Sequence, residues 1–177
     1  MISAARLPDE LLSQAHHLAR KELGRPRQAS LRRAVSTAYY ALFHLLVGES
    51  TRSLAGTERR SSQLRALLGR AYRHDEMAKA SKGFSQGASG LPPTVRALPE
   101  AARIPDDLAD VAQAFCELRY RRESADHDVA AWLNRREVSS LVRRAETAMQ
   151  CWKRVRQDPA SRLYLISLLA WSRMPKE

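Results

Sequence analysis

The spacing of apolar residues constrains the fold of this chain more than any other feature. Along most of the 177 residues the apolar side chains recur every three or four positions, which is the period of an α-helix with one buried face. No segment shows the strict alternation of apolar and polar residues that a half-buried strand requires. The pattern therefore predicts an all-α protein, an up-and-down helical bundle of about five helices plus a short C-terminal helix.

Start and stop signals place the predicted helices. The first begins in the segment LPDELL and keeps an apolar stripe as far as Leu23, where Gly24 and Pro26 end it. A chain of this length is expected to form one domain over residues 1–177. The other helices are expected at about 28–48, from Thr57 to Ala71, from Pro105, from Asn134 to the break at Asp158-Pro159, and at about 159–173.

The second predicted helix is apolar on two sides. A helix of this kind is either central in a bundle or shared with a partner chain. The first side carries Leu31, Val35, Ala38, Leu42 and Leu45, and the second carries Tyr40, Phe43 and Val47.

The segment GFSQGASGLPP interrupts the helical pattern with glycine, serine and proline. It predicts irregular chain over about 83–104. A connection of that length is uncommon in a compact domain, so it is either a mobile functional loop or a tolerated insertion. The insertion is the favoured interpretation.

The chain is strongly basic, with a net charge of +11. Arginine supplies 25 of its 30 basic residues and lysine the other 5. Such an excess favours a polyanionic partner, because guanidinium groups bind phosphates in bidentate fashion and release counterions. A GC-rich genome that inflates arginine would produce the same composition, and charge alone does not separate the two explanations.

Several classes of protein find little support in the sequence. The longest apolar stretch, LYLISLLAW, is far below the ~20 residues that cross a bilayer, and the N-terminus lacks a signal peptide's apolar core. No membrane attachment is expected, and the cytoplasm is the expected location. Cys116 and Cys151 are the only cysteines, so a zinc site or a disulfide framework is not expected and reduced thiols are.

Arg122 falls at the centre of the apolar stripe of the fourth predicted helix. At ~100° per residue it shares a side with Leu118 and Phe115, whereas Arg121 points toward solvent and Arg119 lies at the edge of the stripe. A guanidinium at a buried position is costly unless an anionic or hydrogen-bonding group satisfies it. The sequence therefore predicts a specific partner for Arg122.

His127 follows five residues after Arg122, in the segment RRESADHD. On a continuous helix this spacing turns the two side chains well apart. The short polar residues of SADHD suit a helix end, and a break there would bring His127 back toward Arg122 or toward the same groove from a second chain. The alternative is that Glu123, four residues from both Arg119 and His127, holds them in ordinary surface ion pairs.

Two segments resemble the HEPN superfamily over roughly residues 5–157. The second predicted helix reads LRRAVSTAYYALFHLL, and the fourth ends ELRYRRESADHD, similar to the arginine-led, tyrosine-rich helix and the later "R…AD[YH]D" segment of bacterial members. Many HEPN proteins are metal-independent endoribonucleases with an arginine, four to six residues and a histidine. Arg122 and His127 match this motif. Glu123 and Val129 differ from residues that active members often carry beside it.

The resemblance implies a function and partners. It implies an endoribonuclease that needs no metal or cofactor, with Arg122 and His127 catalytic and with Arg119 and Arg121 contacting RNA. It also implies a homodimer whose two motifs face one cleft, and a toxin or defence role with a cognate antitoxin or nucleotidyltransferase. The alternative is a non-catalytic HEPN interaction module that binds nucleic acid or a partner protein such as a nucleotidyltransferase.

Other polar and aromatic residues are assigned to structure rather than chemistry. No metal-ligand spacing is found around His16-His17, His44 or His74-Asp75-Glu76, and His44 is expected in the core or at an interface. The aromatic residues expected in the core rather than as stacking platforms are Tyr39, Tyr40, Trp132 and Trp152.

Overall fold

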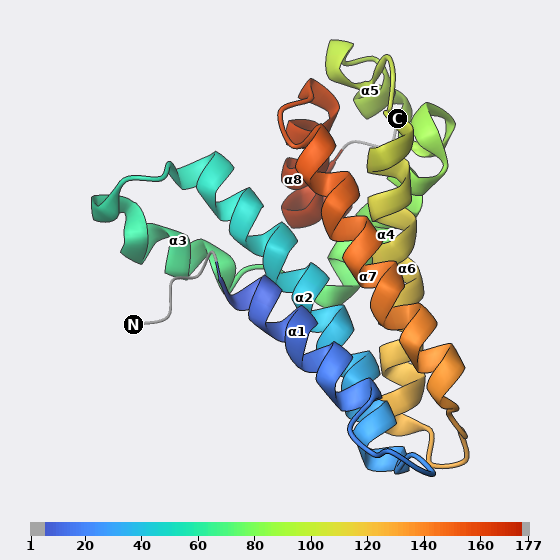
Figure 1. Cartoon of the computed structure of the whole chain (residues 1–177). Helices are drawn as coiled ribbons and strands as arrows, with labels where there is room; N and C mark the ends of the chain where they lie inside the picture. Colours follow the sequence, from blue (N-terminus) through green and yellow to red (C-terminus); the bar gives the residue numbers. More distant parts are fainter. Residues whose placement is uncertain (1–5, 175–177) are drawn as a thin grey trace.

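Four long helices that run alternately up and down form the frame of the molecule (Figure 1). The computed structural model describes residues 6–174, and in that part of the chain it contains eight α-helices and no strand. This confirms the predicted all-α bundle. The α-helices are α1 (Leu7–Ala19), α2 (Gln28–Ala55), α3 (Ser62–Gly69), α4 (His74–Ser85), α5 (Pro93–Arg96), α6 (Asp106–His127), α7 (Arg135–Val155) and α8 (Pro159–Ala170).

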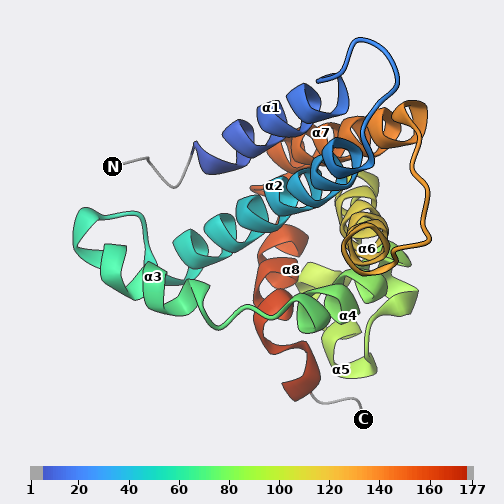
Figure 2. The ribbon, with the colours of Figure 1, turned by 90° about the horizontal axis from the view of Figure 1, so that it is seen from below.

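The frame consists of α1, α2, α6 and α7, with α4 and α8 packed against its upper half (Figures 1 and 2). The apolar stripes predicted from the sequence for the long helices form the faces that pack in the core. On α6 the five residues Leu108, Val111, Ala112, Phe115 and Leu118 are all fully buried. Each large side chain of this kind contributes roughly 1.5–3 kcal/mol when it leaves water, so the facing stripes supply most of the stability of the bundle.

Two predicted helix starts are confirmed by their caps. The side chain of Asn134 accepts a hydrogen bond of 2.9 Å from the backbone N–H of Glu137, and α7 begins at the next residue. The side chain of Asp158 accepts a hydrogen bond of 2.8 Å from the backbone N–H of Ala160, and Pro159 lies in the first turn of α8. Such caps satisfy donors that have no partner inside the helix, so the chain enters each helix at a defined residue.

The first helix ends earlier than its apolar stripe predicted. α1 stops at Ala19, and Leu23 is 101% exposed instead of continuing the buried face. The chain beyond Ala19 is held by distant groups: Arg135 of α7 donates to the carbonyls of Glu22 and Gly24, at 2.5 and 2.7 Å. These tertiary hydrogen bonds hold the chain beyond α1 against the first turn of α7.

The second helix is longer than predicted and continues to Ala55. Its last two turns are polar, so the sequence pattern gave no reason to extend it. In the structure Ser50 is buried and its hydroxyl donates to the carbonyl of Leu165 in α8, at 3.0 Å. Gly56, with φ of 77°, ends the helix in a backbone conformation that favours glycine.

The third helix stands away from the rest of the bundle (Figure 2). A 3-10 turn, η1 (Arg59–Ser61), precedes it, so the α-helix begins at Ser62 rather than near Thr57. None of its residues is buried, and Leu67 is 64% exposed. In the described part of the chain α3 contacts α2, but Leu64 and Leu67 of its apolar stripe remain exposed.

α4 is a helix that the sequence pattern did not predict. The prediction of irregular chain over about 83–104 is also wrong, because that segment contains helical turns. Met77, Ala80 and Phe84 of α4 are fully buried against α6 and α8. The helix is rich in small and polar residues, which hid its period, but those residues permit close packing: Ser81 pairs with Tyr164 at 2.8 Å. Beyond α4 the segment contains α5 and two 3-10 turns, η2 (Gly87–Gly90) and η3 (Pro99–Ala101).

Within residues 6–174 no helix combines the length and apolar character that a bilayer crossing needs. Both cysteines are free; Cys151 is buried and Cys116 is half-buried. A last 3-10 turn, η4 (Trp171–Arg173), places an indole against α4.

Candidate functional site

A row of polar side chains on α2 faces the C-terminal end of α6. Gln28, Arg32, Ser36 and Tyr40 are spaced four residues apart, so they lie on one side of the helix, one above the other. Each of them contacts α6 or the connection that follows it. The row therefore fixes the segment 122–133, which contains both predicted catalytic residues.

Arg32 anchors the end of α6. Its Nη1 donates to the carbonyls of Ala125 and Asp128, both at 2.8 Å, and its Nη2 donates to that of Ala131 at 2.5 Å. Below it, Gln28 makes two hydrogen bonds with the backbone of Leu133, at 2.8 and 3.0 Å. The last carbonyls of a helix have no donor inside the helix. Here the guanidinium of Arg32 donates hydrogen bonds to a carbonyl in the last turn of α6 and to carbonyls of the connection that follows.

Arg122, for which the sequence predicts a partner without naming it, pairs with Asp126. Nε of Arg122 lies 2.9 Å from Oδ2 of Asp126, in an electrostatic contact whose geometry is not that of a hydrogen bond. The other carboxylate oxygen, Oδ1, accepts a short hydrogen bond of 2.5 Å from the hydroxyl of Ser36. Asp126 therefore bridges α2 and the guanidinium and pairs the charge of the arginine that the helical phase identified, while the Nε–H itself makes no hydrogen bond.

Two tyrosine rings support the guanidinium of Arg122. It lies 5.6 Å from the ring centroid of Tyr40 and 5.8 Å from that of Tyr39, and Nη2 donates to Tyr40 Oη at 3.4 Å. The side chain of Arg122 remains 21% exposed. Its charge is held in position by aromatic faces and a carboxylate while part of the group still reaches solvent.

His127 is the last residue of α6, and its side chain is exposed. No break separates Arg122 from His127, because α6 is continuous through both residues and ends at His127. Five residues turn a helix by roughly 140° beyond a full revolution, so the two side chains leave different sides of α6. In one chain the motif is a divergent pair.

Arg119 and Arg121 differ in how firmly they are held. Arg119 lies 4.0 Å from Glu123, at the limit of an ion pair. Arg121 forms a close ion pair with Glu137 in the first turn of α7. The expected surface pairing therefore exists for Arg119, but no ion pair joins Glu123 to His127 in residues 6–174.

The sequence reading assigned no chemistry to His74, which lies beside this site. It is the first residue of α4, and its Nδ1 is 2.5 Å from Oη of Tyr39. Burial, with the positive charges of Arg122 and Arg119, lowers the pKa of His74. The signal that could have located it is the helix start His74-Asp75-Glu76, where acidic residues complement the helix dipole.

Two aromatic expectations are confirmed and one is wrong. Tyr39 and Trp152 are buried. Tyr40 is half-buried, on the second side of α2. Trp132 is not a core residue: it is 66% exposed in the α6–α7 connection, where the guanidinium of Arg25 lies 5.7 Å from its ring.

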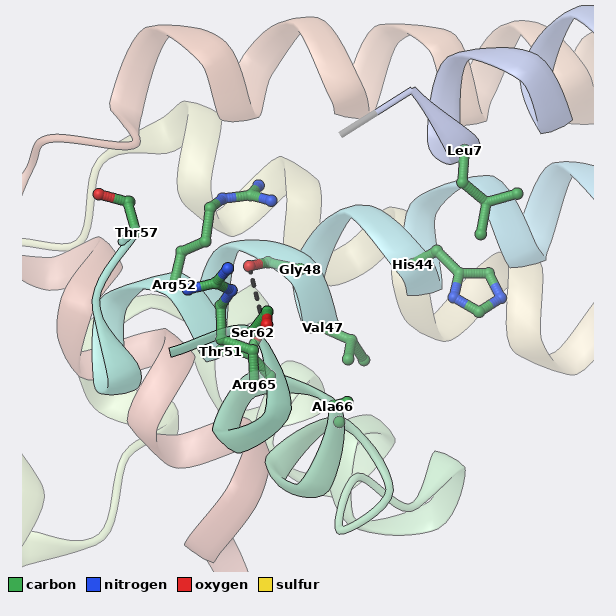
Figure 3. Close-up of a pocket in the computed structure, with 11 residues that line it drawn as sticks. Leu7, His44, Val47, Gly48, Thr51, Arg52, Thr57, Ser62, Arg65 and Ala66 are labelled. Atoms are coloured by element: carbon green, nitrogen blue, oxygen red, sulfur yellow. Dashed lines mark hydrogen bonds between the residues drawn. The ribbon is translucent and has the colours of Figure 1, made fainter. Parts of the chain in front are cut away.

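A separate pocket of about 450 Å³ lies between α2, α3 and the start of α1 (Figure 3). Two arginines line it, but each is already bound within the chain. Arg52 pairs with Glu49, and Arg65 donates to the carbonyls of Gly56 and Glu58 at 2.8 and 3.0 Å. The pocket offers no unengaged charged group, so it is a weaker candidate than the α2–α6 site.

In the part of the chain that the structure describes, no group of three His, Cys, Asp or Glu side chains is arranged to hold a metal ion. Comparison of the chain with protein-family models, with curated proteins and with solved structures finds no match.

Proposed function

We propose that the chain is a metal-independent endoribonuclease in which Arg122 and His127 act on the RNA backbone. The observation that carries the proposal is the positioning of Arg122: a part-exposed guanidinium held by Asp126 and by the faces of Tyr39 and Tyr40. The resemblance of this segment to the HEPN motif, together with the net charge of +11, supports RNA as the polyanion.

The chemistry uses a nucleophile that RNA itself carries. Attack of the 2′-hydroxyl on the adjacent phosphate gives a 2′,3′-cyclic phosphate and a free 5′-hydroxyl. His127 transfers a proton, as an imidazole suits reaction near neutral pH. Arg122 stabilises the additional negative charge on the pentacoordinate phosphate, an effect worth on the order of 10²–10³ in rate for each such donor removed.

The proposal requires a homodimer. Because Arg122 and His127 leave different sides of α6, one chain does not bring them together on one phosphate. A second copy facing the same groove would supply the missing member of each pair. The half-buried side of α2, with Tyr40, Phe43 and Val47, is the apolar surface available for that contact.

The cellular role we propose is that of a toxin or defence effector in the cytoplasm, with a cognate antitoxin or a nucleotidyltransferase as partner protein. Arg119 and Arg121 would contact the RNA backbone on either side of the scissile phosphate. Of the two, Arg119 is the freer, because its pairing with Glu123 is the weaker one.

A second candidate function is a non-catalytic interaction module. The observation in its favour is that Arg122 already has an internal carboxylate and a tyrosine hydroxyl, as an arginine with a purely structural role would have. Such a module would bind nucleic acid or a partner protein and leave RNA intact.

One experiment separates the two candidates. Purified protein is incubated with total RNA in EDTA beside Arg122→Ala and His127→Ala variants, with Arg33→Ala, an exposed arginine of α2, as the matched control. The proposal expects cleavage by the wild type and by Arg33→Ala, with loss in the other two. Cleavage that needs added Mg²⁺, or that persists undiminished in both site variants, would contradict it.

A further inference from the structure

His74 brings a second imidazole to the same side of the molecule as Arg122. The two groups lie on the same pair of aromatic rings: the His74 ring is 5.6 Å from that of Tyr39 and 6.1 Å from that of Tyr40, centroid to centroid. The Arg122 guanidinium is 5.8 and 5.6 Å from these rings. Unlike His127, His74 needs no second copy to lie near this arginine.

The imidazole of His74 is held in one orientation. Its Nδ1 is 2.5 Å from Tyr39 Oη, and its ring stacks on Phe43 with centroids 4.4 Å apart. When Nδ1 carries the proton and donates it to Tyr39, the lone pair of Nε2 is free to accept another. No residue in the described part of the chain occupies Nε2 with a hydrogen bond.

Burial and the neighbouring positive charges favour the neutral form of this imidazole. Burial lowers its pKa first, the guanidinium groups of Arg122 and Arg119 on α6 lower it further, and His44 of α2 acts in the same direction. Asp75, the next residue of α4, opposes them weakly. Burial also raises the pKa of Tyr39, so its hydroxyl stays neutral and its oxygen is able to accept the hydrogen bond from Nδ1–H of His74. The positive end of α4, where His74 is the first residue, also disfavours a charged ring.

We infer that His74 is the general base of the proposed ribonuclease, acting on the 2′-hydroxyl next to the phosphate that Arg122 holds. Its Nε2 removes the proton of the 2′-hydroxyl as O2′ forms a bond to phosphorus. The bond from phosphorus to O5′ breaks, and the departing O5′ takes a proton from His127 of the second copy in the proposed homodimer. The products are a 2′,3′-cyclic phosphate and a 5′-hydroxyl, with one proton gained by His74 and one lost by His127.

This inference rests on the proposed function, and its test is designed so that the two can fail separately. The first measurement follows the imidazole of His74 by NMR while an RNA oligonucleotide with 2′-deoxy at the scissile position, which cannot be cleaved, is added to the full chain. His17→Gln is the matched control, because His17 is an exposed histidine of α1 that takes no part in the proposed site.

The second measurement is the pH dependence of cleavage. The wild type and His17→Gln are expected to gain activity as pH rises through a pKa below the ordinary 6.5 of histidine. His74→Gln is expected to lose that dependence and about 10²–10⁴ in rate. Added imidazole should restore part of the activity of His74→Ala, which a merely structural role for His74 would not allow.

The outcomes are distinct. Absence of cleavage by the wild type, with a perturbed His74 signal on binding, ends the proposed function and the base role but leaves a phosphodiester site at His74. Cleavage with an unchanged pH profile in His74→Gln overturns the inference and leaves the proposed function standing. An unperturbed His74 signal at saturating oligonucleotide also overturns it. If His74→Gln loses its helical circular-dichroism spectrum, its loss of activity no longer tests the base role. The imidazole rescue of His74→Ala and the NMR signal of His74 in the wild type then test that role.

Discussion

Asp126 and Arg122, one turn apart on α6, form an ion pair in which Nε lies 2.9 Å from Oδ2. The same carboxylate accepts a hydrogen bond from Ser36 of α2, so the position of Arg122 depends on contacts between two helices. Asp126 is thus a positioning residue: it acts through Arg122 and makes the guanidinium available at one place on the surface.

Asp126→Asn is expected to lower the free energy of unfolding by about 1 kcal/mol, because it removes a part-buried charge pair. Urea denaturation of Asp126→Asn and of Glu123→Gln tests this. Glu123 is exposed and sits 4.0 Å from Arg119, so its variant should be within experimental error of the wild type. Equal stability of all three proteins would show that the Asp126 pair has no net effect.

Arg32→Gln is expected to destabilise the protein by roughly 2–3 kcal/mol, because carbonyls at the end of α6 lose a charged donor. Hydrogen exchange should also become faster at the amides of Asp128 and Ala131, which belong to the connection that Arg32 holds. Arg33→Gln, one residue along and exposed, is the control. Unchanged exchange in Arg32→Gln would mean that the connection is held by other contacts.

Arg119→Ala and Arg121→Ala are expected to separate in their response to salt. Removing one phosphate contact should reduce the slope of log affinity for single-stranded RNA against log salt by about 0.7. We expect this for Arg119, whose pairing is weak, and a smaller change for Arg121, which is engaged by Glu137. Fluorescence anisotropy at several salt concentrations measures the slopes, and the reverse order would contradict the assignment.

Gly83→Ala is expected to destabilise the protein by about 1–3 kcal/mol. A Cβ at this position would lie 2.5 Å from the ring of Trp171, so the indole must move. Gly24→Ala is the matched control, since nothing lies within 4 Å of its added methyl group. Thermal denaturation followed by tryptophan fluorescence compares them. A Gly83→Ala protein as stable as the control would show that Trp171 adapts without cost.

The carboxylate of Glu76 makes the free energy of unfolding depend on pH in the acid range. Hydrogen bonds from Ser172, first from its side chain and also from its backbone N–H, and from Lys79 lower the pKa of Glu76 from 4.5 to about 2. A depressed folded-state pKa contributes stability above the unfolded value and loses it as pH falls through the folded one. The difference in stability between wild type and Glu76→Gln should therefore be constant above pH 5 and shrink between pH 4.5 and 2. A difference that is unchanged at pH 2.5 would refute this linkage.

Residue spacing alone determined the elements whose signals are local. The caps at Asn134 and Asp158 and the stripes of α6 and α7 depend on residues within one or two turns, so they could be read directly. The phase of Arg122 was of the same kind, since an arginine among buried positions demands a partner whatever the fold.

Tertiary structure decided what local signals do not contain. α1 ends at Ala19, and the carbonyl of Glu22 beyond it is bound by a side chain 113 residues away; α2 continues to Ala55, and Ser50 in its last two turns is buried against α8. The sequence pattern did not predict α4 because its small residues, which pack closely against α6 and α8, give little helical periodicity of apolar side chains. The neighbourhood of Arg122, with Ser36, Tyr40 and His74, joins three helices. No sequence spacing encodes it, because such contacts arise only when the helices pack.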